Sequence, residues 1–371
     1  MSSMGNSDIA FNNLGIYLKD VPSSFSIFGF EIALYGIIIG IGTIAGFCLA
    51  LRLAGKSGVK KELVWDYIIW GIIFGVVCAR LYYVIFAWDY YKDDFWSIFN
   101  IRQGGLAIYG GVIGAFGSMV VFCKIKKTSF TALLDVAVPG LILGQIIGRW
   151  GNFFNREVFG GYYDGLLSMQ LPYAAVRNRD VTQEMLDHMY AGGPECNFIS
   201  VHPTFLYEGA LNLIVLLIML IYRKYKKFDG EIALIYLGGY GIVRFIVEGI
   251  RTDRLTIGDT NIAISQVVAI LCLVFAVVAD IVVRVRLTKK AKLSSLNPEE
   301  KPAEESVPEE NTIQEDPADK KVAEESTEEE VAEEESTEEE TAEEETAVEE
   351  TAEEAAAEEA APDKEPEDSE N

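Results

Sequence analysis

Long apolar stretches alternate with short polar ones over the first 290 residues of the chain. Seven of these apolar stretches come close to the roughly 20 residues that a helix needs to cross the hydrocarbon core of a bilayer. They lie at about residues 30–51, 64–86, 105–123, 132–150, 204–222, 232–250 and 262–284. The pattern predicts an all-α polytopic membrane protein with seven transmembrane helices.

The charges between the stretches predict the orientation of the chain. Basic residues follow the first, third, fifth and seventh stretch, at residues 52–61, 124–127, 223–227 and 286–290. The loop after the second stretch carries Asp89, Asp93 and Asp94 instead. Because basic loops stay on the cytoplasmic side, we expect the N-terminus outside the cell and the C-terminus in the cytoplasm.

The polar stretches divide the chain into segments. We expect an extracytoplasmic N-terminal segment at residues 1–29, without the basic region and cleavage site of a removable signal peptide. Helices one to four then occupy residues 30–150, and helices five to seven occupy residues 204–290. Between them, residues 151–203 keep several aromatic side chains to bury, so they predict a small ordered extracytoplasmic head.

The C-terminal residues 291–371 differ from the rest in composition. From Ser294 onward they hold 34 acidic residues against four lysines, a net charge of −30, within a chain whose net charge is −25. With almost no aromatic residue to bury, this segment predicts a disordered acidic cytoplasmic tail. Docking of a basic partner and repulsion from anionic lipid are both open roles for it, and its partner is unknown.

Histidine and cysteine give no sign of a metal site. The chain has two histidines, His188 and His202, and five cysteines without a CxxC spacing, four of which lie in or beside apolar stretches. We therefore predict no metal and no cofactor, and we interpret these cysteines as small buried side chains. Nothing in the chain predicts binding of nucleic acid.

Pairs of glycines four residues apart recur in the apolar stretches, as at Gly42 with Gly46 and at Gly110 with Gly114. Such pairs let helix backbones approach closely. They predict a tightly packed bundle.

Charged residues stand where a long apolar stretch ends, in the sequence GRWGNFFNREVFG at residues 148–160. Arg149 in this sequence could extend to the membrane interface as a purely structural residue. Other helices, however, bring polar groups to the same predicted depth. These groups are Tyr35, Tyr109, Glu208 with Asn212, and Arg244 with Glu248 and Arg251.

The common depth favours a functional site over a set of structural pairs. Glu208 and Asn212, like Arg244 and Glu248, are four residues apart and so share a helix face. One such ion pair could serve packing alone, but charges buried for packing need not gather near one leaflet. We therefore predict a site for an amphipathic ligand in the outer half of the bilayer, with Arg80 at a similar height.

The residue types at this depth indicate the ligand. Guanidinium groups present paired donors to phosphate oxygens, and Asn152 and Asn155 lie beside Arg149 in the sequence. This set fits a phosphate with apolar chains attached, which is a phospholipid of the bilayer. The carboxylates Glu157, Glu208 and Glu248 would hold the arginines or accept a proton from a nucleophile.

Five motifs together resemble the prolipoprotein diacylglyceryl transferase family. They are Leu34-Tyr35-Gly36, GGLAIYGG, GRWGNFFNREVFG, HPTFLYE and VRFIVEGIRTD, in this order over about residues 30–284. The resemblance implies transfer of the diacylglyceryl group of phosphatidylglycerol to the lipobox cysteine thiol of a bacterial prelipoprotein signal peptide. A thioether forms and glycerol phosphate leaves.

The resemblance also implies roles for individual residues. Arg149 is similar to the family's phosphatidylglycerol-binding arginine, and Arg244 is similar to its second essential arginine. Family positions are further matched by Tyr35, Asn152, Glu157, Gly160, Glu208 and Glu248. We add Asn155, His202 and Arg251 as candidate substrate-binding residues, because they lie in the matching motifs.

Tyr109 departs from the family pattern, because many members have histidine there. We keep Tyr109 among the candidate catalytic residues, although a neutral tyrosine with a pKa of about 10 is a poor base. Glu208, Glu248 and His202 are the other candidates for accepting the thiol proton. Positive charge that lowers the pKa of the thiol is a further alternative.

Three other classes of protein compete with a transferase. A lipid transporter should place its site near the midplane in an internal repeat, which the chain lacks. A hydrolase of lipid head groups calls for a metal or a histidine-based nucleophile system, which two histidines hardly provide. A scaffold acting through its tail would not need the polar groups at one depth.

Overall fold

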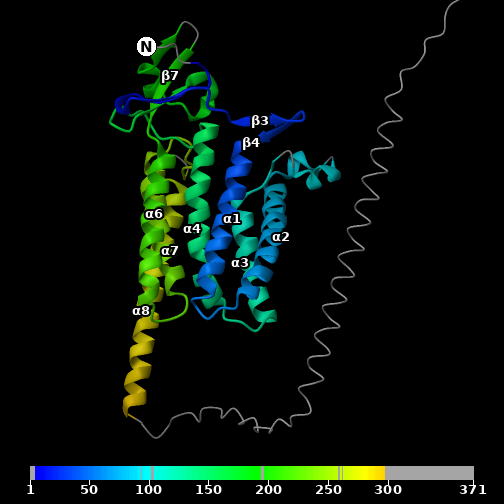
Figure 1. Ribbon diagram of the computed structural model, residues 1–371, viewed down its shortest axis with the longest axis vertical. Coiled ribbons are helices and arrows are strands. Elements are labelled where there is room, and N and C mark those ends of the chain that lie inside the picture. The colour runs from blue at the N-terminus through cyan, green and yellow to red at the C-terminus, as the bar shows by residue number, and fades with distance from the viewer. Residues whose placement is uncertain are drawn as a thin grey trace, which may run out of the picture. The chain divides into compact units, whose positions relative to one another are not determined.

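The computed structural model describes residues 5–92, 94–101, 104–193, 196–257, 260 and 262–296. Within them, seven helices are long and apolar enough to cross a membrane, which confirms the predicted number of spans (Figure 1). They are α1 (Leu34–Ala54), α2 (Lys61–Phe86), α3 (Ile108–Ile125), α4 (Phe130–Asn155), α6 (Thr204–Tyr222), α7 (Glu231–Ile250) and α8 (Ile264–Leu296). A short helix, α5 (Gln183–Asp187), lies between α4 and α6 in the chain.

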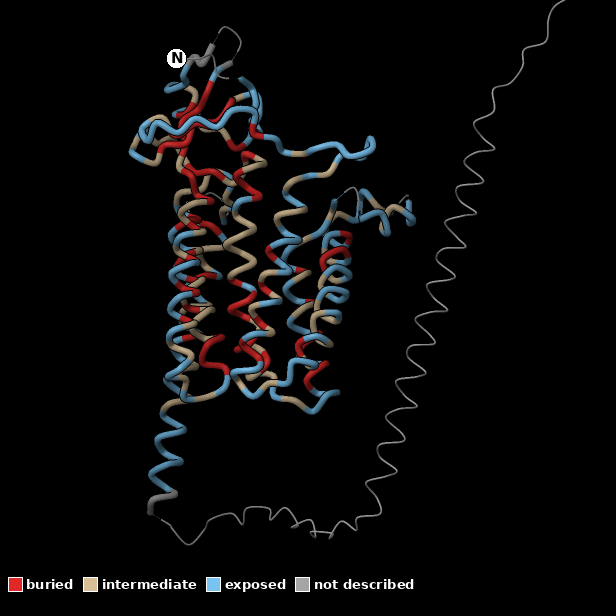
Figure 2. The backbone as a smooth tube through the Cα atoms, in the orientation of Figure 1, coloured by how far each residue is buried: buried red, intermediate tan, exposed pale blue. Residues whose placement is uncertain are grey.

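Helix α4 is the central element of the bundle. It packs against α1 on one side and against α6 and α7 on the other, while α2 pairs with α3 and α8 packs on α7 (Figure 1). Buried positions follow the helix faces that meet inside the bundle, and exposed positions face outward (Figure 2). Many of the outward side chains are apolar, among them Ile69, Ile72 and Ile73 of α2, as a lipid-facing surface requires.

Glycines set the close approach of α1 to α4. A Cβ atom on Gly42 would lie 3.2 Å from the carbonyl oxygen of Gly144, and one on Gly46 would fall on the carbonyl oxygen of Gly140. On the other side of the bundle, Gly110 and Gly114 of α3 lie in the same way against the backbone of α2. The close packing predicted from these glycines is therefore present at both contacts.

We expect Gly46→Ala to destabilise the protein by about 2 kcal/mol or more, because α1 and α4 must separate to admit the methyl group. The measurement is thermal unfolding of the purified protein in detergent. Gly40→Ala is the matched control, since a Cβ atom on Gly40 of the same helix meets nothing within 4 Å. A lower unfolding temperature for the control than for Gly46→Ala would contradict this account.

A five-stranded antiparallel sheet stands at the end of the bundle where α4 ends and α6 begins (Figure 1). Its strands are β1 (Ile9–Phe11), β2 (Ile16–Leu18), β5 (Met169–Pro172), β6 (Tyr190–Gly193) and β7 (Cys196–Val201), in the order β2-β1-β5-β7-β6. We call this sheet with its connecting segments the head. We predicted residues 1–29 and 151–203 as separate segments. In the structure, the pairing of Ala10 with Gln170 joins them in one sheet.

The head is joined to the bundle through a shared apolar core. Phe153 from the last turn of α4 and Phe205 from the first turn of α6 pack with strand residues such as Ile9, Leu171 and Ile199. This packing lets α4 continue to Asn155, five residues beyond the predicted end of the span. Arg156 then ends the helix with a φ of +53°.

Arg156 also fixes the N-terminal segment to the head. Its guanidinium donates hydrogen bonds to the carbonyl oxygens of Ser7 and Val21, each at 2.6 Å, and to that of Phe154 at 3.1 Å. Burial lowers the pKa of this guanidinium. The buried donors of Arg156 thus hold the start of the chain against the end of α4.

A separate hairpin of β3 (Ser24–Ile27) and β4 (Phe30–Ala33) leads into α1. Residues 30–33 are therefore strand, and the predicted start of the first span at residue 30 was four residues early. At the other end, α8 reaches Leu296 and includes the first residues of the predicted tail. Residues 297–371 of that tail lie outside the described residues.

Arg80 of α2 forms hydrogen bonds to backbone carbonyl oxygens of the segment that follows this helix. Its guanidinium donates to the carbonyl oxygens of Ser97, Ile98, Asn100, Gly104 and Gly105, at 2.7 to 3.3 Å. These bonds hold the segment that connects α2 to α3. We predicted Arg80 at a depth similar to that of the candidate site residues. Its hydrogen bonds indicate that it stabilises the connection between α2 and α3.

Candidate functional site: an arginine cluster between three helices

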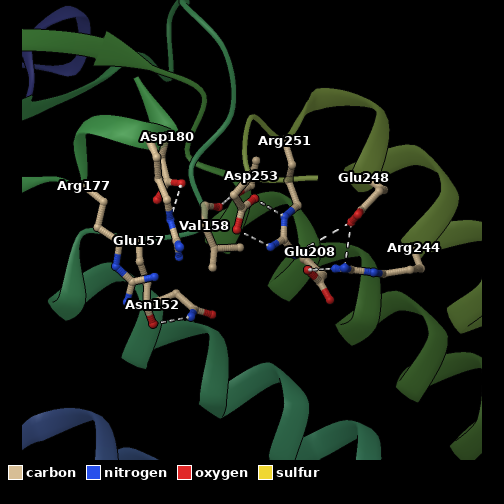
Figure 3. A network of polar contacts seen from close by, with 12 residues as sticks. Asn152, Glu157, Val158, Arg177, Asp180, Glu208, Arg244, Glu248, Arg251 and Asp253 are labelled. Carbon is tan, nitrogen blue, oxygen red and sulfur yellow. Dashed lines mark hydrogen bonds and ion pairs between the residues drawn. The ribbon is translucent and has the colours of Figure 1, made fainter. Parts of the chain in front are cut away.

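A buried carboxylate joins two arginines where α4, α6 and α7 meet below the head. Glu208 of α6 is 1% exposed, and its Oε1 lies 3.0 Å from Nη2 of Arg149 on α4. Its Oε2 lies 3.8 Å from Nη1 of Arg244 on α7. Because removing a buried carboxylate from water is costly, Glu208 depends on these two guanidinium groups, and it sets the spacing between them. Figure 3 shows Glu208 beside Arg244.

The ion pairs continue along the outer part of α7. Arg244 Nη2 lies 2.7 Å from Glu248 Oε2, and Arg251 Nη1 lies 3.8 Å from the same oxygen. Arg251 also forms a two-point pair with Asp253 at 2.8 and 2.7 Å. We call Arg149, Glu208, Arg244, Glu248, Arg251 and Asp253 the arginine cluster.

The pair of Arg251 and Asp253 shows how strongly the two charges depend on each other. Burial by itself lowers the pKa of Arg251, but the hydrogen bonds and charge of Asp253 raise it overall. Burial likewise raises the pKa of Asp253, and Arg251 brings it below its usual value. Each of these two groups therefore stabilises the charged form of the other.

Polar side chains from the signature sequence extend the cluster on one side. Arg149 Nη1 donates to Asn152 Oδ1 at 3.3 Å, and Asn152 Nδ2 donates to Glu157 Oε1 at 3.0 Å. Asn155 Nδ2 donates to the same carboxylate oxygen at 3.4 Å. The other oxygen of Glu157 lies 3.2 Å from Arg177 of the head, so this chain of contacts runs from the bundle to the surface (Figure 3).

Gly160 and Gly161 connect the cluster to the head through backbone bonds. The N–H of Gly160 donates to the carbonyl oxygen of His202, and the N–H of Gly161 donates to that of Ile250. A Cβ atom on Gly160 would lie 2.7 Å from Ile250 Cγ2 and 2.8 Å from His202 Cβ. Glycine is therefore required where residue 160 passes between the start of α6 and the end of α7.

His202 lies directly before α6, between two tyrosines. Its ring stacks on that of Tyr163 at a centroid distance of 4.0 Å, and its Nδ1 lies 3.2 Å from the hydroxyl of Tyr207. Burial lowers the pKa of His202. The imidazole is therefore neutral at pH 7 and can accept a proton.

Two predicted site residues lie on other helices. The ring of Tyr35 at the start of α1 lies against Gly151, because a Cβ atom on Gly151 would be 2.7 Å from Tyr35 Cδ2. This places Tyr35 next to Asn152. Tyr109 lies at the start of α3, where its ring centroid is 6.5 Å from that of Tyr82 on α2, and no contact described for it reaches the arginine cluster.

Two further residues take part in the network without having been singled out from the sequence. Asp253 lies inside a quoted motif, so its position in VRFIVEGIRTD is a signal that could have found it. Arg177 lies in the head, in a segment without a motif. Only the fold brings it to Glu157.

The arrangement can bind an anion between helices. A guanidinium has five N–H donors, and within the described residues Arg149 contacts Asn152 through Nη1 and Glu208 through Nη2. Arg149 and Arg244 are about one-fifth exposed, whereas Glu208 between them is closed off. An anion that reaches Arg149 and Arg244 would therefore find N–H donors on both, while Glu208 holds the two guanidinium groups in place.

The fold defines a multi-pass membrane protein in which ion pairs join α4, α6 and α7. Residues 22–282 match the family model described as prolipoprotein diacylglyceryl transferase. The chain belongs to this family and is a bacterial membrane transferase, as its sequence motifs predicted.

Curated relatives agree along nearly their whole length. A phosphatidylglycerol–prolipoprotein diacylglyceryl transferase from Finegoldia magna is 40% identical over 267 residues, which cover 72% of this chain and 97% of the relative. The enzyme of the same name from Clostridioides difficile is 37% identical over 269 residues, with 72% and 96% covered. A third, from Clostridium perfringens, is 38% identical over 273 residues, with 73% and 97% covered.

Proposed function

We propose that this chain transfers the diacylglyceryl group of phosphatidylglycerol to the lipobox cysteine thiol of prelipoproteins, the first step of lipoprotein maturation. The observation that carries the proposal is the convergence of Arg149 and Arg244 from separate helices on one buried carboxylate. Two guanidinium groups held in this way are suited to a phosphate with several oxygens. Family membership supports this reaction, and the arginine cluster is the candidate site at which it takes place.

The lipid phosphate binds at Arg149 and Arg244 in this proposal. Asn152 orients Arg149 through its side-chain oxygen, while Glu157 accepts hydrogen bonds from both Asn152 and Asn155. Arg251 and Glu248 keep Arg244 in place from the head side. We propose Tyr35, Gly160 and His202 as the remaining substrate-binding residues.

We further propose that the head lies outside the cell and that both the lipid and the signal peptide enter from the bilayer. The basic residues after α1, α3 and α6 all lie at the end of the bundle opposite the head, as the cytoplasmic side of a bacterial membrane protein requires. A single cysteine in place of Asp164 of the head should react with an impermeant thiol reagent added to intact cells with the outer layers removed. Labelling only after lysis would contradict this orientation.

The chemical step is a displacement at the C3 carbon of the lipid glycerol. The cysteine sulfur forms the new bond to C3, the bond from C3 to the phosphate oxygen breaks, and its electron pair stays on the leaving glycerol phosphate. Arg149 and Arg244 stabilise the charge that grows on this oxygen. Since the substrate thiol is the nucleophile, we expect no covalent bond between lipid and enzyme during turnover.

His202 is the best-placed acceptor for the thiol proton. Glu208 and Glu248 already hold guanidinium groups, and Tyr109 lies on the pair of α2 and α3. The imidazole of His202 is neutral at pH 7, because burial lowers its pKa. Deprotonation by His202 should therefore be lost only as the pH falls through this lowered value.

We expect His202→Gln to slow transfer by about 100-fold at pH 7, the usual contribution of a general base. The loss should shrink as the pH rises towards the thiol pKa of about 8.5, because the substrate then ionises unaided. Initial rates between pH 5.5 and 9 measure this. His188→Gln, the other histidine of the head, is the control and should keep the wild-type profile, while a pH-independent loss in His202→Gln would indicate a structural role.

The direct test of the proposed function is reconstitution of the purified protein with phosphatidylglycerol and a lipobox peptide. Mass spectrometry should show that the peptide gains one diacylglyceryl unit, and that a peptide with serine in place of the cysteine gains none. Release of one glycerol phosphate for each modified peptide completes the balance. An unmodified peptide would rule out the proposed reaction for this chain.

A further inference from the structure

Polar side chains continue inside the bundle on the far side of the arginine cluster from the head. Gln145 lies four residues before Arg149 on α4, Asn212 lies four residues after Glu208 on α6, and Tyr240 lies four residues before Arg244 on α7. Residues four apart lie on the same helix face. Each helix that contributes to the cluster therefore presents another polar side chain one turn further from the head.

Gln145 and Tyr240 are linked through Tyr236, and we call these three side chains and Asn212 the polar layer. The amide nitrogen of Gln145 donates to the hydroxyl of Tyr236 at 3.0 Å, and the rings of Tyr236 and Tyr240 stack at a centroid distance of 5.7 Å. Beyond the layer, Ile142, Val215 and Met219 belong to a buried apolar core. Apolar side chains therefore close the layer on the side away from the arginine cluster.

Two amide side chains of the layer, those of Asn212 and Gln145, have polar atoms without a hydrogen-bond partner in the described part of the chain. Asn212 is 0% exposed, and neither its Nδ2 nor its Oδ1 has a partner in the described part of the chain. The oxygen of Gln145 also lacks a partner there. A buried amide without partners is costly in a membrane protein, so these atoms indicate that a polar group from outside the chain completes the layer.

We propose that Asn212 is a specificity-determining residue that donates a hydrogen bond to an acyl ester carbonyl of the bound lipid. This inference rests on the proposed function, which places the lipid phosphate at Arg149 and Arg244. One helical turn is about 5.4 Å, so Asn212 lies about that far along α6 from Glu208. A three-carbon glycerol backbone separates the phosphate of a phospholipid from its ester carbonyls by a similar length.

The chemistry of the amide matches this occupant. An ester carbonyl accepts a hydrogen bond, and the buried NH2 group of Asn212 is a donor without a partner in the described part of the chain. The arginines recognise the phosphate, which many lipids share, whereas Asn212 recognises the link between glycerol and acyl chain. A lipid with ether links lacks this carbonyl and leaves the buried amide unpaired.

The test compares diester phosphatidylglycerol with its dialkyl ether analogue in vesicles of otherwise equal composition. The bond that breaks is the same in both lipids, so any difference in kcat/KM reports recognition. We expect the wild type to favour the diester about tenfold, because a buried amide left unpaired costs roughly that factor. Asn212→Leu, which keeps a similar volume, should lose this preference by slowing transfer from the diester while leaving the diether rate unchanged.

Ser118→Ala is the matched control, since it removes a buried hydroxyl from α3 on the other side of the bundle. It should keep the wild-type preference. Equal rates of the wild type on both lipids would overturn the proposal and leave water as the partner of Asn212, and this comparison needs no variant. An equal loss on both lipids in Asn212→Leu would overturn it as well, whereas no transfer by the wild type from either lipid would refute the proposed function instead.

Discussion

Arg149→Lys is expected to lower the rate of diacylglyceryl transfer by at least about 100-fold. Lysine keeps the positive charge but has a single ammonium in place of a planar fork of donors. It cannot contact Glu208, Asn152 and a phosphate together, as the Nη1 and Nη2 contacts of Arg149 allow. Breaking a buried ion pair costs about 3 to 5 kcal/mol, which corresponds to this loss or more. The measurement is the initial rate on reconstituted protein with a lipobox peptide.

Arg177→Lys is the matched control for this prediction. Arg177 also pairs with a carboxylate of the signature sequence, but its side chain is 59% exposed. Ion pairs at such exposed positions contribute about 0 to 1 kcal/mol, so we expect a change of less than about fivefold. Near-normal transfer by Arg149→Lys, with normal protein folding, would contradict the role of Arg149 in phosphate binding.

Hydropathy predicted the seven helices because a membrane span needs a long apolar stretch whatever its neighbours are. The sheet of the head has no such local signal. Its strands are three to six residues long, and β1 finds its partner β5 about 160 residues further along the chain. At Phe30–Ala33, pairing with β3 overrides an apolar composition that favoured a helix. Contacts distant in the sequence therefore decided the structure at these places.

The candidate site shows the same division between local and distant contacts. The spacing of Arg244 and Glu248 predicted a pair on one helix face, and the side chains lie 2.7 Å apart. The contact of Arg149 with Glu208 joins α4 to α6, and no spacing along the chain encodes it. The predicted depth of a residue in the membrane also does not tell which neighbouring helices its side chain faces. Tyr109 shares the predicted depth of the cluster but lies at the pair of α2 and α3.

The strongest test of the junction between head and bundle is Gly160→Ala. The added methyl group would lie 2.7 Å from Ile250 Cγ2, 2.8 Å from His202 Cβ and 3.0 Å from the carbonyl oxygen of Ile250. Backbone cannot yield as a flexible side chain can, so α7 and the start of α6 must move apart. Because Arg244, Glu248 and Glu208 stand on these two helices, we expect transfer to fall about 100-fold, as for a displacement of about 1 Å in a catalytic geometry.

Gly161→Ala provides the control, because a Cβ atom on Gly161 meets nothing within 4 Å. The two variants add the same methyl group to adjacent residues, and only one of them disturbs the contact of the head with α7. Transfer rates and unfolding temperatures of both proteins should separate a displaced site from a general loss of folding. If Gly160→Ala were as active as Gly161→Ala, the position of α7 against the head would not matter for catalysis, and the arginine cluster would not need the spacing that the fold imposes on it.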